Sequence, residues 1–154
     1  MDIDKITKEL GVFLGKGGFV FKDIRCITDA DLSLVILSVR VSGNLEVVFY
    51  DNNAELLRAV SVVFQEMCKK KFHCYKNIII DINQREIDLI NETKSKAQMA
   101  IDRVLHFNKP YEFDYLNAYQ RMLIHSYVKR NKKVSSCSVG ELGDRRLVIS
   151  RKDG

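Results

Sequence analysis

Near its C-terminus the chain reads Asn117-Ala118-Tyr119-Gln120-Arg121-Met122-Leu123-Ile124-His125. We expect a helix from Asn117 to about Arg130. Within it, Arg121 and His125 are four residues apart, a spacing that places two side chains on one face of a helix. These two residues are therefore the first candidates for a working surface.

Net positive charge is concentrated around this stretch. Residues 115–154 hold nine basic and three acidic side chains, a net charge of +6, whereas residues 1–114 hold sixteen basic and seventeen acidic ones, a net charge of −1. A nearly neutral body with a cationic end suggests an electrostatic surface for a polyanion. Nucleic acid is the first candidate and an anionic membrane surface the second. The alternative is a solvated basic tail that binds nothing.

The segments on either side of the stretch carry turn and strand signals. The only proline, Pro110, stands in the connector Asn108–Phe113 and ends the unit before it. After the expected helix, two short strands are predicted near Val134 to Val139 and Arg145 to Ser150, joined by a turn that contains two glycines. The C-terminal part thus reads as one helix followed by a hairpin.

Residues 4–105 predict the order helix, strand, strand, helix, strand, helix. We expect a helix over Asp4 to Leu14, ended by the turn Gly15-Lys16-Gly17-Gly18, and then strands over Phe19 to Ile27 and Leu32 to Val41. A further extended stretch is expected over Leu45 to Tyr50. The remaining elements are a helix from Ala54 to Lys71, a strand over Lys76 to Ile82 and a helix over Gln84 to Leu105. This order is compatible with a small α+β domain of the type II KH kind.

The Asn117–His125 stretch resembles the signature of the R-three-H domain, which is named for an arginine and a histidine separated by three residues. Its flanks, Asn108–Phe113 and Gly140–Ile149, look like those of this domain in bacterial Jag (SpoIIIJ-associated) proteins. Upstream, Ile78-Ile79-Ile80-Asp81-Ile82 followed by Gln84-Arg85-Glu86 resembles the last strand of the family's KH domain and the start of its long helix. The resemblance covers about residues 35–150.

The resemblance implies an α+β protein with a degenerate type II KH-like domain over residues 1–107 and a small R-three-H domain, a helix packed on short strands, over residues 108–154. One departure matters. Where KH domains carry a Gly-x-x-Gly loop, this chain has Asp51-Asn52-Asn53-Ala54. That loop lets the nucleic-acid backbone approach main-chain amides, and Asp51 adds a negative charge there. We therefore expect a KH half that folds but is impaired for RNA binding; residues 1–20 have no assigned role.

By this resemblance the chain is expected to bind single-stranded RNA or DNA through its C-terminal surface. Arg121 would contact a phosphate or stack on a base, with His125 beside it. The alternative is that Arg121 pairs with a carboxylate and His125 is a hydrogen-bonded boundary residue. The residues expected to contact nucleic acid are Arg121, His125, Lys129, Arg130, Lys132, Lys133, Arg145, Arg146 and Tyr119. Tyr127 is either a stacking residue or part of the core.

Similarity to Jag further implies a role in post-transcriptional control linked to cell elongation, division or envelope assembly, together with a small single-KH partner protein or self-association. The alternative function is a protein-protein interaction or dimerisation module whose KH half has lost RNA binding. The sequence leaves open the choice between RNA and DNA, the target and the oligomeric state.

Other chemistry has little support in the sequence. Four scattered cysteines indicate reduced thiols of a cytoplasmic protein. The acidic start Met1-Asp2-Ile3-Asp4 does not resemble a secretory signal. The longest mainly apolar run is too short to span a bilayer. Cys68, His73 and Cys74 are too few ligands for a zinc site. No phosphate-binding P-loop or catalytic triad is recognisable. We expect no enzyme activity, no cofactor, no metal and no membrane insertion.

Overall fold

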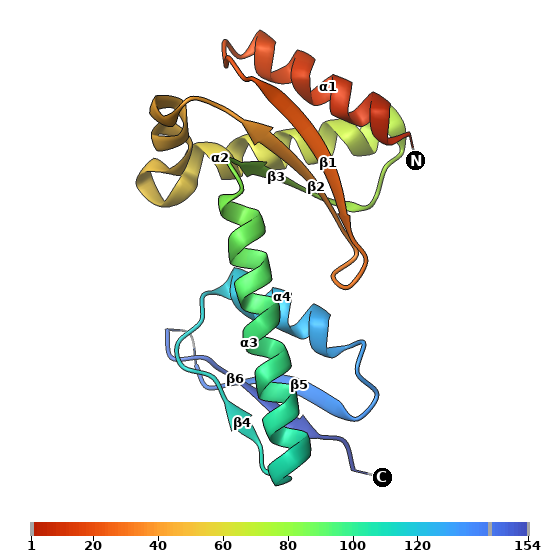
Figure 1. Cartoon of the computed structure of the whole chain (residues 1–154), viewed down its shortest axis with the longest axis vertical. Coiled ribbons are helices and arrows are strands. Elements are labelled where there is room, and N and C mark those ends of the chain that lie inside the picture. Colours follow the sequence, from red (N-terminus) through yellow and green to blue (C-terminus); the bar gives the residue numbers. More distant parts are fainter. Residues whose placement is uncertain (1, 142, 154) are drawn as a thin grey trace. The chain divides into compact units, whose positions relative to one another are not determined.

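The computed structural model describes residues 2–141 and 143–153 and divides into two compact units, Met1–Asp88 and Leu89–Gly154 (Figure 1). The elements in chain order are α1 (Ile3–Lys16), β1 (Asp23–Asp29), β2 (Leu34–Arg40), α2 (Gly43–Phe72), β3 (Asn77–Ile82), α3 (Arg85–Phe107), β4 (Tyr111–Glu112), α4 (Ala118–Val128), β5 (Val134–Val139) and β6 (Arg146–Arg151). The predicted mixed α+β class is confirmed.

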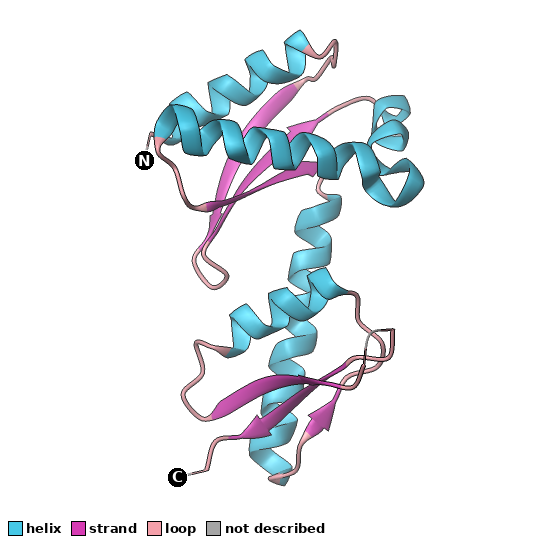
Figure 2. Ribbon diagram, turned by 180° about the vertical axis from the view of Figure 1, so that it is seen from behind, coloured by secondary structure: helices cyan, strands magenta, loops and turns pink. Residues whose placement is uncertain are grey.

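The first unit contains a three-stranded sheet in the order β1-β2-β3. β1 pairs antiparallel with β2, with Cys26 opposite Leu37, and β2 pairs parallel with β3, with Leu37 opposite Ile80. A parallel pair needs a long crossover connection, which α2 provides here. Both α1 and α2 lie across one face of this sheet (Figure 2).

The core of the first unit lies between the sheet and its two helices. α1 buries Ile6, Leu10 and Leu14, which recur every four residues along one face of the helix. Phe64 of α2 is completely buried and packs against the ring of Phe13, with 5.8 Å between the ring centroids. These contacts fix both helices on the sheet.

The expectation of an extended stretch over Leu45–Tyr50 is wrong, because these residues form the first part of α2. Ser42 caps the helix by accepting the N–H of Leu45 at 3.5 Å. Leu45 and Phe49 are four residues apart and both pack against the core, while Val47 and Val48 remain exposed. Helical amphipathicity and the cap therefore outweigh the β propensity of the valines.

α2 is interrupted at Asp51–Ala54. Asp51 is extended, with φ −63° and ψ 154°, and the next three residues are all left-handed: Asn52 has φ 48°, Asn53 φ 58° and Ala54 φ 58°. A left-handed conformation costs little for glycine but roughly 1–2 kcal/mol for most other residues, with asparagine better tolerated. The break divides α2 into two helical segments joined by a tight loop.

The start of α3 is held by the buried carboxylate of Asp81 at the end of β3. Its Oδ2 accepts the hydroxyl of Ser38 at 2.6 Å and the N–H of Gln84 at 3.0 Å. Its Oδ1 accepts the N–H groups of Glu86 at 2.8 Å and Ile87 at 3.3 Å. Asp81 is fully buried, and a negative charge at a helix N-terminus is favourable. This carboxylate thus joins the central strand, the edge strand and the helix start.

The second unit contains a sheet in the order β4-β6-β5 with antiparallel neighbours. α3 and α4 pack against this sheet (Figure 1). Ile101 of α3 and Ile124 of α4 share a buried core with Leu147 and Ile149 of β6. The predicted strands near Val134 to Val139 and Arg145 to Ser150 correspond to β5 and β6. β4 was not predicted, because two residues carry no periodic signal.

The division between the units lies at Asp88/Leu89, whereas the sequence placed it between residues 107 and 108. The difference has a packing cause. Ala97, Ala100, Ile101 and Val104 on one face of α3 belong to the core of the second unit. Most of α3 therefore belongs with α4 and the C-terminal sheet.

Candidate functional site

α4 presents one apolar and one polar face. A capping box fixes its start: Asn117 accepts the N–H of Gln120 at 2.8 Å, and the Gln120 side chain accepts the N–H of Asn117 at 3.1 Å. Leu123, Ile124 and Val128 are buried against the unit's core. The remaining positions, which include the predicted arginine and histidine, therefore lie on the face that borders solvent.

Arg121 is held at the entry to α4. Its guanidinium Nη1 donates to the carbonyl oxygen of Leu116 at 2.6 Å. A positive charge near a helix N-terminus is unfavourable, and this hydrogen bond offsets that effect. Because the acceptor is a carbonyl and not a carboxylate, the charge of Arg121 is not neutralised by this contact. The remaining N–H groups of the fork can then bind an anion.

His125 lies half-buried between two hydroxyl groups of β5. Nδ1 is 2.6 Å from the Oγ of Ser136, and Nε2 is 3.3 Å from the Oγ of Ser138. Burial lowers the pKa of His125, and the nearby charges of Lys129, Arg121 and Arg145 lower it further. The imidazole is therefore neutral at pH 7 and above.

These residues border a surface hollow of about 430 Å³. Its lining consists of Ala118, Arg121, Met122, His125, Ser126, Lys129, Ser138 and Arg145. Three of these side chains are permanent cations, and none of the lining residues is acidic. Met122, which is 46% exposed, supplies an apolar wall. The hollow is thus suited to an anionic ligand that also has an apolar surface.

The structure brings four of the nine predicted site residues together in the hollow: Arg121, His125, Lys129 and Arg145. The other five lie outside its lining. Arg130, Lys132 and Lys133 lie at or beyond the end of α4, in the connection to β5, and Arg146 begins β6 with a guanidinium nitrogen 3.6 Å from Asp144. Tyr119 is half-buried with its hydroxyl inside the protein.

Tyr127, expected either to stack on a base or to belong to the core, donates its hydroxyl to Gln98 of α3 at 2.8 Å and so connects the two helices. Sequence reasoning missed Met122, Ser126 and Ser138 as lining residues, and Ser136 as a partner of the histidine. Side chains alternate between the two faces of a strand, so Ser136 and Ser138 of β5 lie on the same face as the buried Val134. This alternation could have indicated that both serines face inward. Their partner on α4 could not be read from spacing.

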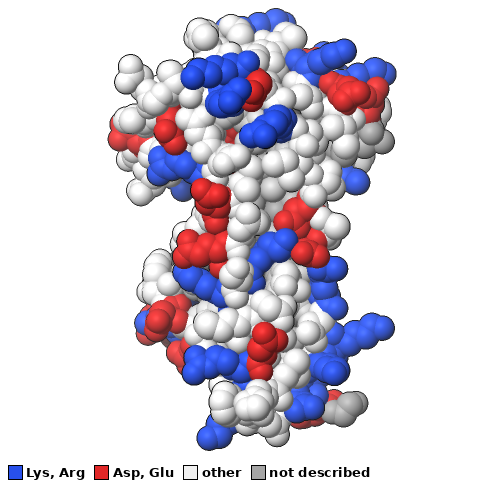
Figure 3. Space-filling model, viewed as in Figure 1, with Lys and Arg blue, Asp and Glu red and all other residues white. Residues whose placement is uncertain are grey.

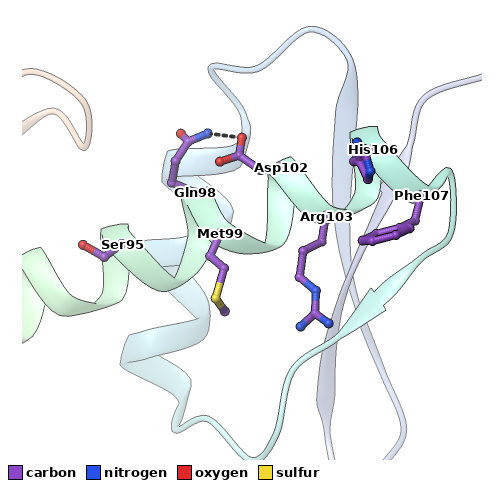
Figure 4. Close-up of a pocket in the computed structure, with 7 residues that line it drawn as sticks. All are labelled: Ser95, Gln98, Met99, Asp102, Arg103, His106 and Phe107. Carbon is purple, nitrogen blue, oxygen red and sulfur yellow. Dashed lines mark hydrogen bonds between the residues drawn. The ribbon is translucent and has the colours of Figure 1, made fainter.

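A second hollow of about 580 Å³ lies on the exposed side of α3. Figure 4 shows Gln98 and Asp102 pointing to one side of the helix and Met99 and Arg103 to the other. The Gln98 amide donates to the Asp102 carboxylate at 2.8 Å. This hollow mixes charges of both signs, as does the face of the molecule seen in Figure 3. It is less suited to a polyanion than the hollow on α4.

Neither a metal site nor a membrane span is found among residues 2–141 and 143–153. No group of three or more His, Cys, Asp or Glu side chains there is placed to hold a metal ion. No helix in this part of the chain combines the length and the apolar character needed to cross a membrane.

Comparison with known proteins bears on the second unit. No curated protein matches the chain. Residues 92–151 match the family model of the R-three-H domain, the same domain that the α4 sequence resembles. Such domains are generally associated with binding of single-stranded nucleic acid. The match begins on α3 and ends with β6, so it spans nearly the whole second unit. The resemblance of the first unit to the KH domain of Jag proteins stays a prediction. At residues 92–151 the chain therefore contains an R-three-H domain, with its name-giving arginine and histidine in the cationic hollow on α4.

Proposed function

We propose that this protein binds single-stranded nucleic acid, RNA in the first place, through the hollow on α4. The observation that carries the proposal is the lining itself: the cations Arg121, Lys129 and Arg145 surround a half-buried imidazole, and no lining residue is acidic. The cations bind phosphates, and the fork of Arg121, already oriented by Leu116, offers paired donors to phosphate oxygens. Met122 gives an apolar surface against which a base can pack.

Phosphate contacts predict a measurable salt dependence. Each phosphate neutralised on a single strand contributes a slope of roughly −0.7 to the plot of log affinity against log salt. Three cations in the hollow therefore predict a slope of about −2. Individual base contacts would change the affinity without changing this slope.

The test is fluorescence anisotropy of a labelled single-stranded RNA across a salt series. The variant Lys129→Gln, Arg145→Gln removes two of the three cations and keeps Arg121 bonded to Leu116. Its expected affinity is about tenfold lower at low salt, with a slope closer to zero by about 1.4. Arg103→Gln is the control, because it removes one positive charge from the α3 hollow of the same unit and should leave binding unchanged. If both variants bind like the wild type, the α4 hollow is not the interface.

The first unit is proposed to be a KH-like domain of type II. Three features support this. Its elements run α1-β1-β2-α2-β3, β2 is parallel to β3 and antiparallel to β1, and a tight loop at Asp51–Ala54 interrupts α2 where a KH domain carries Gly-x-x-Gly. Three of the four residues in the loop are left-handed, although the loop contains no glycine. Side chains at Asn52 and Asn53, and the charge of Asp51, then oppose close approach of phosphate, so RNA binding falls to the second unit.

The cellular role proposed from the resemblance to Jag is post-transcriptional control in the cytoplasm, linked to cell elongation, division or envelope assembly, with a small single-KH protein as partner. It is tested by crosslinking the protein to RNA in growing cells and sequencing the RNA recovered. RNAs recovered with the wild type and with Arg103→Gln, but lost with Lys129→Gln, Arg145→Gln, would support the role. Equal recovery from all three proteins would contradict it.

A second candidate function is a protein-interaction module in the first unit. It is favoured by exposed valines beside a mainly apolar hollow of about 420 Å³: Val20 is 82% exposed, Val47 67% and Val48 51%. Sedimentation analysis of the wild type and of Val47→Ser, Val48→Ser distinguishes the two. Concentration-dependent self-association that the double variant abolishes would support this second function, and a monomer throughout would count against self-association.

A further inference from the structure

His125 differs from the other charged residues of the hollow, because an imidazole titrates near physiological pH whereas Arg121, Lys129 and Arg145 keep their charge. Its ring lies between the hydroxyls of Ser136 and Ser138. In neutral imidazole one nitrogen donates and the other accepts, and a hydroxyl can take either role. When the ring gains a proton, rotation of one hydroxyl preserves both contacts. The ring can thus change its charge without moving.

The groups that face this ring oppose its protonation in the free protein. Arg121 lies one turn before it on α4, Lys129 caps the end of that helix one turn after it, and Arg145 approaches from the β5–β6 hairpin. Neither the hairpin carboxylates Glu141 and Asp144 nor Glu112 and Asp114, which precede α4, line the hollow. Together with burial, the three cations lower the pKa of His125.

A phosphate bound among these cations reverses the local field. An anion at hydrogen-bond distance favours the charged form of an imidazole. Ser138 lines the hollow and contacts Nε2, so the Nε2 side of the ring is the one that faces a ligand. In the charged ring the Nε2 N–H donates to the Ser138 hydroxyl, which can turn its own O–H toward a phosphate oxygen, while Ser136 continues to accept from Nδ1.

We propose that binding of a nucleic-acid phosphate in the hollow is coupled to uptake of one proton from solvent by His125, with Ser136 and Ser138 as positioning residues that hold the ring in both charge states. The inference rests on the proposed function and adds its regulation by pH. A complex that binds one proton more than its free components tightens as the pH falls, with a limit of tenfold per pH unit. Between pH 7.5 and pH 6 we expect affinity to rise about fivefold.

The experiment uses a labelled oligothymidylate with hydroxyl ends, at constant ionic strength, followed by anisotropy with a pH-insensitive dye. Neither thymine nor a phosphodiester titrates between pH 6 and 7.5, so a pH response comes from the protein. The chain has three histidines, which allows a complete comparison of His125→Gln with the controls His73→Gln and His106→Gln. The expected result is a pH response that only His125→Gln abolishes.

Two outcomes are distinguishable. Equal wild-type affinity at both pH values, or a response that survives in His125→Gln, would overturn this inference and leave the proposed function intact. No wild-type binding to the oligothymidylate at either pH, together with no binding to the single-stranded RNA of the salt series, would overturn the proposed function, and the inference with it.

NMR titration of the histidine ring protons supplies a measurement that does not depend on a variant. The pKa of His125 is expected to rise when the oligothymidylate binds. An unchanged pKa of His125 in the complex would refute the coupling.

Ser136→Ala tests the positioning role: the ratio of affinities at the two pH values should fall toward one, and Ser136→Thr, which retains a hydroxyl, should restore it. A ratio unchanged in Ser136→Ala would remove Ser136 from the proposal.

Discussion

Replacement of Asp81 by asparagine is expected to destabilise the first unit strongly while changing hardly any volume. The Oδ2 of Asp81 accepts two hydrogen bonds, from the Ser38 hydroxyl at 2.6 Å and the Gln84 N–H at 3.0 Å. The Oδ1 accepts two more from the first turn of α3. Asparagine keeps one acceptor oxygen and replaces the other by an amide that donates. One pair of donors is then left without an acceptor in a site that is completely buried.

The magnitude follows from the number of bonds lost. A hydrogen bond to a charged group contributes about 1.5–3 kcal/mol, and a buried donor without a partner costs about 1–3 kcal/mol. The serine hydroxyl can rotate to accept from the new amide, which recovers part of the loss. We therefore expect Asp81→Asn to lower the free energy of unfolding by about 3 kcal/mol. Ser38→Ala removes the hydroxyl donor itself, so no buried donor is left without a partner. It should lower the free energy of unfolding by only about 1 kcal/mol.

Hydrogen–deuterium exchange of the amides of β2 and β3 is the appropriate assay, because it reports on the first unit separately from the second. Exchange in β5 and β6 is the internal control and should not change. A cost below about 1 kcal/mol for Asp81→Asn, or a cost no larger than that of Ser38→Ala, would refute the view that this carboxylate is the main anchor of α3.

Three further predictions concern backbone conformation and pH. Ala54→Gly should stabilise the first unit by about 0.5 kcal/mol in urea unfolding, because Ala54 is left-handed with φ 58°, whereas alanine-to-glycine changes inside helices usually cost about 1 kcal/mol. Gly140→Ala should lower the free energy of unfolding by about 2–4 kcal/mol in thermal unfolding, since φ is 93° and an added Cβ would lie 2.6 Å from the carbonyl oxygen of Asp144. Gly143→Ala is the control, because Gly143 has the same φ of 93° but no atom within 4 Å of an added Cβ, and it should lower the free energy of unfolding by about 1 kcal/mol. The second unit should lose stability as the pH falls below about 6.5, the unfolded-state value, because the lowered pKa of His125 makes the unfolded chain bind more protons than the folded one. Acid titration of the wild type should show this loss, and His125→Gln should lack it.

Helix periodicity accounts for what the sequence could predict of the fold. Ile6 and Leu10 mark α1, and Ala97, Ile101 and Val104 mark α3 with its apolar face, because a face buried against one core repeats every three or four residues. The same reasoning failed at Leu45–Tyr50. Its run of β-branched and aromatic residues looks like a strand, and only the position of Phe49 against the core reveals a helix.

The candidate site was predictable only along α4. Arg121, His125 and Lys129 follow from their spacing of four residues on a single helix. Arg145 was expected from charge, but its place beside α4 depends on how the hairpin folds back. The contact of His125 with Ser136 joins residues eleven apart on different elements, and no local pattern encodes it. Lys132 and Lys133 were also expected from charge, but they do not line the hollow, and their contact with nucleic acid stays a prediction.

The hydrogen bond from Arg121 to the Leu116 carbonyl also affects the entropy of association. An arginine side chain that is free in solution loses up to about 2 kcal/mol of conformational freedom when a ligand immobilises it. Here the guanidinium is fixed when the protein folds, at 2.6 Å from its acceptor, so much of this loss precedes the encounter with a ligand. Lysine at position 121 would carry the same charge on a flexible stem without a planar fork. The exchange of arginine for lysine would therefore preserve the net charge of the hollow and still weaken the complex, mainly through faster dissociation.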